Sequence, residues 1–142
     1  MERGQESMIS KIADIEQIHV LRIPPGGDIL LSLREFVAEK SIRFGAILNG
    51  IGSATKYRVH VVKTTDLPPG DVFFGEEGAF DILNITGFIV EGRVHAHITL
   101  SNTEKAVGGH LEEGTSVLTF SIITLGETPQ CDFSQWDKIR EF

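Results

Sequence analysis

Three of the five histidines in this 142-residue chain lie within one short stretch, Arg93–Glu113. Two of them form the pattern His95-x-His97, and His110 follows after twelve further residues, of which the last two are glycines. Neutral imidazole is a common ligand of transition metals, and three imidazoles with one coordination position left open are the zinc arrangement associated with catalysis. The sequence therefore predicts His95, His97 and His110 as ligands of a single metal ion.

Alternation along the chain indicates how these side chains could meet. Residues 93–100 alternate apolar and polar side chains, as in a strand with one buried face, and His95 and His97 share the polar face. Side chains two residues apart on a strand start ~6.6 Å from one another, so both rings can lean toward one ion. If residues 106–111 return as the second strand of a hairpin with a loop of two or four residues, His110 falls on the same face. An odd-length loop without a bulge would place His110 on the opposite face.

The identity of the metal and of its fourth ligand stays open at this point. One cysteine in the chain excludes a thiolate-rich structural zinc site, and imidazoles favour zinc but also suit nickel, copper and iron. Water, a carboxylate such as Glu112, or a group from another subunit could complete the site. The alternative without a metal is a set of solvated histidines on an exposed strand face.

The surrounding residues predict the scaffold, a single α+β domain with a mainly antiparallel β-sheet and one main helix packed on it. Asp28 is a good N-cap, and the apolar residues after it recur at helical spacing, which predicts a helix over 29–40. β-rich runs separated by turn residues predict the strands. These runs are 18–23, 42–48, 55–62, 79–90, 93–100 and 116–125, with a further short run at 72–74 flanked by loop residues.

Two other histidines and a glycine-rich segment have simpler explanations. His19 and His60 lie in separate strand-like runs with no ligand-type partner close in sequence, and we interpret both as structural. Asn49–Ser53 resembles the start of a phosphate-binding loop, but the pattern G-x-G-x-x-G fails at Thr55, and an alternating strand follows instead of a helix. These glycines therefore predict a tight turn or a bulge between two strands.

Charge and composition narrow the possible partners. The net charge is −7 and the thirteen Lys and Arg residues are scattered, so nucleic acid is disfavoured as a direct partner of this chain. A single cysteine, Cys131, allows no intrachain disulfide and fits a reducing compartment. We find no apolar run of ~18 residues and no signal-peptide pattern. A cytoplasmic protein without a membrane partner is expected.

The segment from about Ile18 to Glu127 resembles the plant and prokaryote conserved domain, known as the PPC or PCC domain. The matching pieces occur in the family's order: GGDILLSLREFV, ILNGIGSA, FDILNITGFI, HAHITL and VGGHLEEGTSVLTF. The resemblance implies an α+β fold that assembles as a homotrimer. It also implies a metal site, because stand-alone prokaryotic members keep histidines that match those predicted above as ligands.

The resemblance also divides the chain into three segments. Residues 18–128 form the PPC-like domain, preceded by a partly disordered N-terminal extension, 1–17. Residues 129–142 form a C-terminal tail, in which Trp136 and Phe142 are expected to dock on the domain or on a neighbouring subunit.

Three functions follow from these observations. The first is a metal-binding homotrimer, with zinc the preferred ion, in which the metal acts as a Lewis acid on a small carbonyl or oxo-acid ligand. The second is a DNA-associated regulatory or interaction module, because plant members carry AT-hooks with an Arg-Gly-Arg-Pro core. This sequence contains no such motif. The third is a structural role, in which the histidines tie strands or subunits together.

Overall fold

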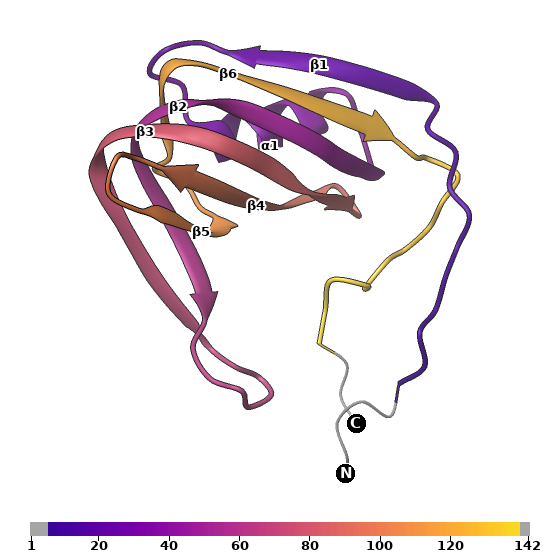
Figure 1. Cartoon of the computed structure of the whole chain (residues 1–142). Coiled ribbons are helices and arrows are strands. Elements are labelled where there is room, and N and C mark those ends of the chain that lie inside the picture. The colour runs from indigo at the N-terminus through magenta and orange to yellow at the C-terminus, as the bar shows by residue number, and fades with distance from the viewer. Residues whose placement is uncertain (1–5, 140–142) are drawn as a thin grey trace.

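A single six-stranded antiparallel sheet with one helix forms the part of the chain that the computed structural model describes, residues 6–139 (Figure 1). This arrangement confirms the predicted α+β class and the single domain. The elements are, in chain order, β1 (Gln17–Ile23), α1 (Ile29–Glu39), β2 (Phe44–Val62), β3 (Asp71–Val90), β4 (Arg93–Ser101), β5 (Ala106–Leu111) and β6 (Ser116–Glu127).

The sheet curls so that its edge strand β5 also pairs with β2 in the middle of the sheet. Its strand order is β1-β6-β2-β3-β4-β5, and β5 pairs in addition with β2. The second pairing joins Val59 with Leu111 and His60 with His110. The far half of β2 and the strands β3, β4 and β5 therefore close on one another, and residues about fifty positions apart in the sequence become neighbours.

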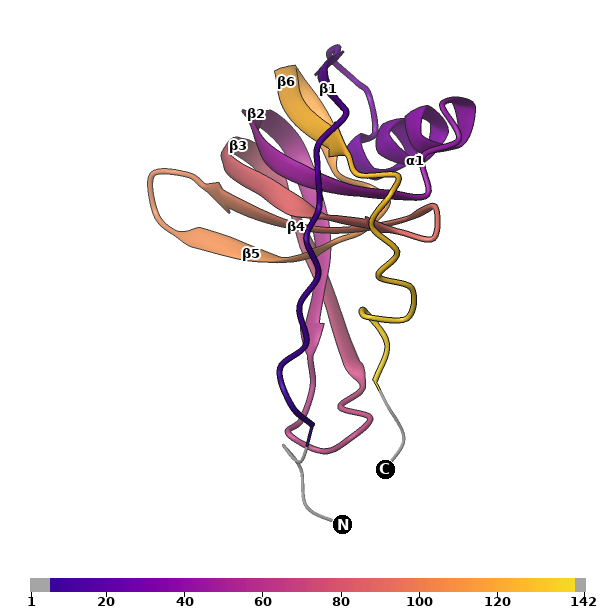
Figure 2. The same ribbon diagram turned by 90° about the vertical axis from the view of Figure 1, so that its right-hand side faces the viewer.

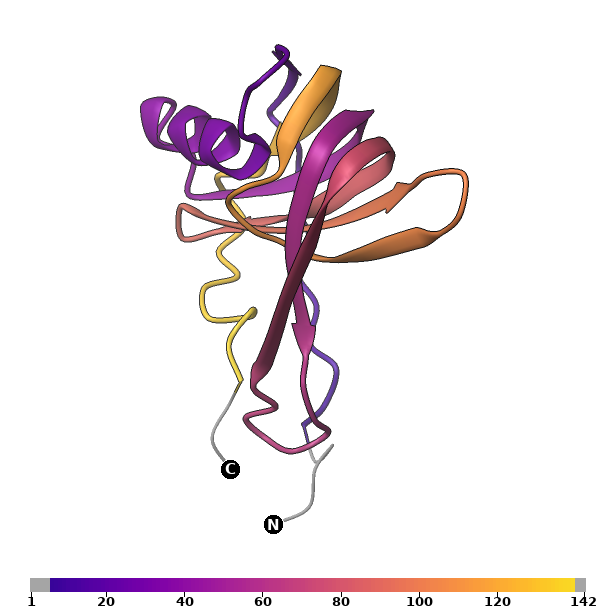
Figure 3. The same ribbon diagram turned by 90° about the vertical axis from the view of Figure 1, so that its left-hand side faces the viewer.

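The helix covers one side of the sheet, and the β4–β5 hairpin curls away on the other side (Figures 2 and 3). It begins at the predicted N-cap, where Asp28 Oδ1 accepts a hydrogen bond of 3.0 Å from the backbone N–H of Leu31. Its apolar side chains Ile29, Leu33 and Val37 are buried in the core. The largest fully buried side chains of the sheet are Ile47, Ile85, Ile89, Ile98, Leu100, Leu111, Ile123 and Leu125.

Two strands are longer than the sequence predicts. The predicted strands 42–48 and 55–62 are parts of one strand, β2, which begins at Phe44. Its register with β6 shifts between Ile47 and Asn49 and again between Gly52 and Ala54, which marks bulges on both sides of the glycines. A Cβ atom at Gly52 would lie 2.2 Å from the carbonyl oxygen of Phe120, so the two backbones come closer there than any side chain would allow. The bulge alternative is therefore confirmed, and the tight turn is wrong.

The strand β3 likewise continues through Gly75–Gly78, which the sequence predicts as a loop. A Cβ atom at Gly75 would lie 2.2 Å from the carbonyl oxygen of Tyr57, so glycine permits a close approach of β2 here instead of a chain reversal. The far ends of β2 and β3 extend from the body as a long arm (Figure 1).

The described residues before β1 and after β6 run along the same side of the molecule (Figures 1 and 2). Residues 1–5 and 140–142 are outside the described part, and with them the first residues of the predicted N-terminal extension and the predicted docking of Phe142. Among residues 6–139, no helix is long and apolar enough to cross a membrane.

Candidate metal site

The predicted hairpin of the histidine stretch is present. The strands β4 and β5 pair antiparallel around a four-residue loop, which is closed by a 2.9 Å hydrogen bond from the N–H of Asn102 to the carbonyl of Lys105. In this register His97 lies directly opposite His110. The even loop length therefore places the third histidine on the face of the other two, as the parity argument requires.

The rings of His95, His97 and His110 gather on this face. The ring centroids of His95 and His110 are 4.5 Å apart, those of His97 and His110 5.4 Å, and those of His95 and His97 5.7 Å. Imidazoles this close can each direct one nitrogen toward a shared ion.

A fourth histidine joins the cluster from β2. His60 pairs with His110 across the strands, and their rings stack with centroids 4.2 Å apart. His60 Nδ1 is 2.5 Å from Glu112 Oε1, and His110 Nδ1 is 3.8 Å from the same oxygen. Each of these three residues offers a ligand-type atom, and those atoms lie within 4.8 Å of one another.

His60 is thus the residue of the site that sequence reasoning missed. Its neighbours in sequence are strand residues without chemical interest, and its partners His110 and Glu112 come from the far side of the closed sheet. No local pattern carries that information, because the β2–β5 pairing joins segments about fifty residues apart. His19 fits its structural interpretation, with Nε2 2.7 Å from Glu127 Oε2 and its ring edge-on to Phe36.

Hydrogen bonds at Nδ1 orient two of the predicted ligands. His95 Nδ1 is 3.3 Å from Asp137 Oδ2, and His110 Nδ1 is 3.3 Å from the carbonyl oxygen of Leu111. A ring that donates through Nδ1 keeps the lone pair on Nε2, which is the tautomer that a metal needs.

The backbone around Glu112 is fixed by contacts with β2 and with the helix. The N–H of Glu112 donates to the carbonyl of Arg58 over 3.1 Å. The fully buried Thr115 accepts a 3.0 Å hydrogen bond from the N–H of Arg58, and Asp28 Oδ2 accepts one of 2.7 Å from the N–H of Gly114. The same aspartate therefore caps the helix and holds the loop that carries Glu112.

The electrostatics of the cluster favour neutral imidazoles. Burial, together with the neighbouring His95, His60 and His97, lowers the pKa of His110 to about 4. Burial and the same kind of repulsion also lower the pKa of His97. Both rings are therefore neutral at pH 7, so a metal ion would displace no proton from either of them.

This shift predicts that the metal-free protein loses stability in weak acid. The unfolded chain takes up a proton on residue 110 near pH 6.5, whereas the folded chain does so only near pH 4. The stabilisation is therefore complete above pH 6.5 and lost as the pH falls toward 4, by up to about 3 kcal/mol. Urea unfolding of the chelated protein at pH 7.5 and 4.5 checks this, with His110→Gln as the comparison. An equal loss in both proteins contradicts the assignment to His110.

Two hollows border the histidines. One of about 590 Å³ is lined by His95 and His97 together with Phe88, Phe133 and Trp136. The other, of about 380 Å³, reaches His95 and His110 from the side of Arg34. The cluster is therefore open to small molecules from outside.

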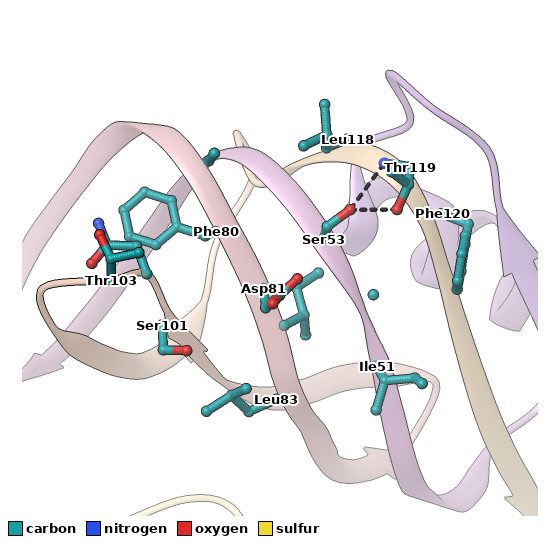
Figure 4. Close-up of a pocket in the computed structure, with 14 residues that line it drawn as sticks. Ile51, Ser53, Phe80, Asp81, Leu83, Ser101, Thr103, Leu118, Thr119 and Phe120 are labelled. Atoms are coloured by element: carbon teal, nitrogen blue, oxygen red, sulfur yellow. Dashed lines mark hydrogen bonds between the residues drawn. The ribbon is translucent and has the colours of Figure 1, made fainter.

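A third hollow, of about 800 Å³, lies away from the histidines over β2, β3 and β6. Figure 4 shows its apolar side chains, among them Ile51, Leu83 and Leu118, around the hydrogen bond between Ser53 and Thr119. Asp81 is the one ionisable side chain among its lining residues. This composition suits contact with another apolar surface better than catalysis.

The fold and a match to a known domain together define the class of protein. Residues 10–129 match the Plants and Prokaryotes Conserved (PCC) domain. The match covers most of the chain, and the protein belongs to this family.

The curated relatives that the chain matches are longer than this chain. The protein named Bifunctional protein GlmU from Synechococcus sp. (strain JA-2-3B'a(2-13)) is 28% identical over 120 residues, which are 84% of this chain. The chain spans only 18% of that protein's length.

Solved structures share the fold at low identity. A plant- and prokaryote-conserved protein from Pyrococcus horikoshii aligns with a TM-score of 0.75 and 23% identity over 89% of both chains. The metal-containing protein AF0104 from Archaeoglobus fulgidus aligns with 0.74 and 21% over 86% of this chain and 87% of its own. A candidate DNA-binding protein from Bacteroides thetaiotaomicron aligns with 0.68 and 22% over 84% and 83%.

Proposed function

We propose that the protein binds one divalent transition metal, preferably zinc, through His95, His97 and His110. The observation that carries this proposal is the convergence of the three rings, with centroids 4.5 to 5.7 Å apart, on one face of the β4–β5 hairpin. A structurally similar protein from Archaeoglobus fulgidus contains metal, which supports the same role here.

The set His60, His110 and Glu112 is the competing ligand set, and we favour the first set for a chemical reason. His60 Nδ1 already contacts Glu112, and its Nε2 is 3.6 Å from a carboxylate oxygen of Asp71. Within residues 6–139, by contrast, Nε2 of His95 and of His110 makes neither a hydrogen bond nor a carboxylate contact, because their polar contacts are all at Nδ1, so both nitrogens are available to an ion. His60 and Glu112 then serve to hold the His110 ring in place by stacking and by charge.

The open hollow of about 590 Å³ supports a small-molecule ligand beside the metal. When bound, a zinc ion supplies a Lewis acid that can polarise a carbonyl oxygen. The lining of the hollow includes polar side chains, among them His95 and His97, and apolar ones, among them Phe88 and Trp136. These residues fit a small carbonyl or oxo-acid compound with an apolar group. The DNA-associated role is supported by a candidate DNA-binding protein of similar fold. We rank it second, because the net charge of this chain is −7 and its Lys and Arg residues are scattered.

Elemental analysis of protein purified without added metal tests the metal proposal. We expect close to one equivalent of a transition metal per chain, removable with a chelator and restored by zinc. A content below about 0.2 equivalents, with no binding of added zinc or cobalt, contradicts the proposal.

We further propose that the chain assembles as a homotrimer through the apolar surface of β2 and β6. Ile51 and Ile122 are direct partners across these strands, and their side chains are 54% and 37% exposed. Leu83 and Leu118 are exposed beside them. Exposed apolar residues that form a continuous patch usually mark a contact with another protein.

Replacing Ile51 by aspartate should therefore dissociate the trimer, because the contact would bury an unpaired charge. Light scattering after size exclusion is expected to give about three times the 15.6 kDa chain mass for the parent protein and the single chain mass for Ile51→Asp. Val62→Asp is the matched control, since Val62 is equally apolar and 67% exposed but lies at the end of the arm. A parent protein that is monomeric at high concentration contradicts the proposal.

A further inference from the structure

The C-terminal tail after β6 lies against β2 and β3 and reaches His95 of β4. The ring of Phe133 packs on Phe44 and Phe88, with centroids 5.1 and 6.0 Å apart, and Trp136 packs on Phe133. Cys131 is buried at the start of this segment. The family match ends at residue 129, so these contacts come from a part of the chain beyond the shared domain.

The packing of the tail brings the carboxylate of Asp137 to the first histidine of β4. Its Oδ1 accepts a 2.8 Å hydrogen bond from Arg93 Nη2, and its Oδ2 is 3.3 Å from His95 Nδ1. The side chain of Asp137 is only 14% exposed. Glu91 also links Arg93 to the tail, because its Oε2 accepts hydrogen bonds of 3.1 Å from Arg93 and from Gln135.

We infer that Asp137 is a positioning residue for the metal site, which holds His95 in the tautomer with the proton on Nδ1 and directs Nε2 toward the ion. Metal-bound histidines commonly donate their other N–H to a carboxylate, which fixes the ring and raises the basicity of the ligand nitrogen. The role in metal binding rests on the function proposed above, whereas the tautomer of His95 is a property of the metal-free chain.

The arrangement predicts a specific effect of asparagine at position 137. The carboxylate has two acceptor oxygens, one for Arg93 and one for His95, but an amide has only one. Arg93 can only donate, so the amide oxygen turns to Arg93 and the amide N–H₂ turns to His95. Nδ1 then becomes the acceptor and the proton moves to Nε2, where it blocks the lone pair that an ion would use.

The first test reads the tautomer of His95 in the metal-free 142-residue chain. Long-range ¹H–¹⁵N NMR spectra at pH 7.5, assigned with His95→Ala, are expected to show Nδ1–H on His95 in the parent protein and Nε2–H in Asp137→Asn. Asp132→Asn is the matched control, since Asp132 is a carboxylate of the same tail whose side chain bonds Ser134. An Nε2–H tautomer in the parent protein, or the same tautomer in Asp137→Asn, overturns the inference.

The second test uses Co²⁺ alone as the probe. Its affinity, read from the visible absorption of the bound ion, should fall about 10- to 100-fold in Asp137→Asn and stay unchanged in Asp132→Asn. An unchanged affinity in Asp137→Asn overturns the role of Asp137 in metal binding. If the parent protein binds no Co²⁺, the metal proposal fails, and the tautomer measurement still decides whether Asp137 orients His95.

The fluorescence of Trp136, the single tryptophan of the chain, separates positioning from loss of the tail contact. Unchanged emission in Asp137→Asn shows that the tail stays docked. If the emission moves toward that of a solvated indole, Asp137→Glu decides the matter, because it keeps two acceptor oxygens. Recovery of the Nδ1–H tautomer in Asp137→Glu supports the inference, and failure to recover it overturns the inference.

Discussion

Replacing His95 and His97 together by alanine is expected to lower the affinity for zinc by roughly four orders of magnitude. Zinc bound to a folded site contributes about 10 kcal/mol or more, and three protein ligands share this energy. Loss of two of the three removes roughly 6 kcal/mol, which is the expected change. Competition of the metal-free protein with a chromophoric chelator measures it.

His19→Ala is the control for this variant, since His19 lies in β1 and contacts Glu127 outside the cluster. It should bind zinc as the parent protein does. Far-ultraviolet circular dichroism should be the same for both variants, because the side chains of His95 and His97 are on the face of β4 away from the buried Ala96 and Ile98. If the double variant keeps the affinity of the parent protein, the ion is held by other residues, and the proposed ligand set is wrong.

Replacing Gly87 by alanine should destabilise the metal-free protein by about 3 kcal/mol, near the upper end of what overpacking costs. A Cβ atom at this position would lie 2.1 Å from the carbonyl oxygen of His95 and 2.7 Å from Cα of Ala96. To make room for this Cβ atom, β3 and β4 must separate beside His95, the first of the predicted ligands. We expect a midpoint of thermal unfolding about 10 °C lower.

Asn84→Ala on the same strand is the control, because Asn84 is exposed and its loss should change the midpoint by little. The folded Gly87→Ala protein should also bind Co²⁺ more weakly than the parent protein does, since the separation of β3 and β4 moves His95. A Gly87→Ala protein as stable as the parent protein would contradict the close approach of the β3 and β4 backbones at Gly87.

Much of the fold can be predicted from short stretches of the sequence. Three features depend only on residues that are near one another in the sequence, and each is present in the structure. They are the N-cap at Asp28, the helix that follows it, and the alternation of β4. The long strands β2 and β3 were wrongly divided because glycine is a turn residue in most contexts. Here Gly52 and Gly75 are needed for close approach of another strand, which only the sheet reveals.

The candidate site likewise combines contacts that the local sequence predicts with contacts that only the folded chain reveals. The hairpin parity that pairs His97 with His110 is local and could be predicted. The contact of His60 with His110 depends on the closure of β5 onto β2, and the contact of Asp137 with His95 depends on the packing of the tail. Neither pairing leaves a periodic signal in the sequence, because each joins segments more than forty residues apart.

A crystal structure of the zinc-loaded protein, with anomalous diffraction recorded on both sides of the zinc absorption edge, tests the central claim most directly. We expect one anomalous peak per chain, bonded to His95, His97 and His110 through Nε2 at ~2.0–2.1 Å. A peak held by His60, His110 and Glu112, or no peak in fully loaded crystals, would contradict the proposed site.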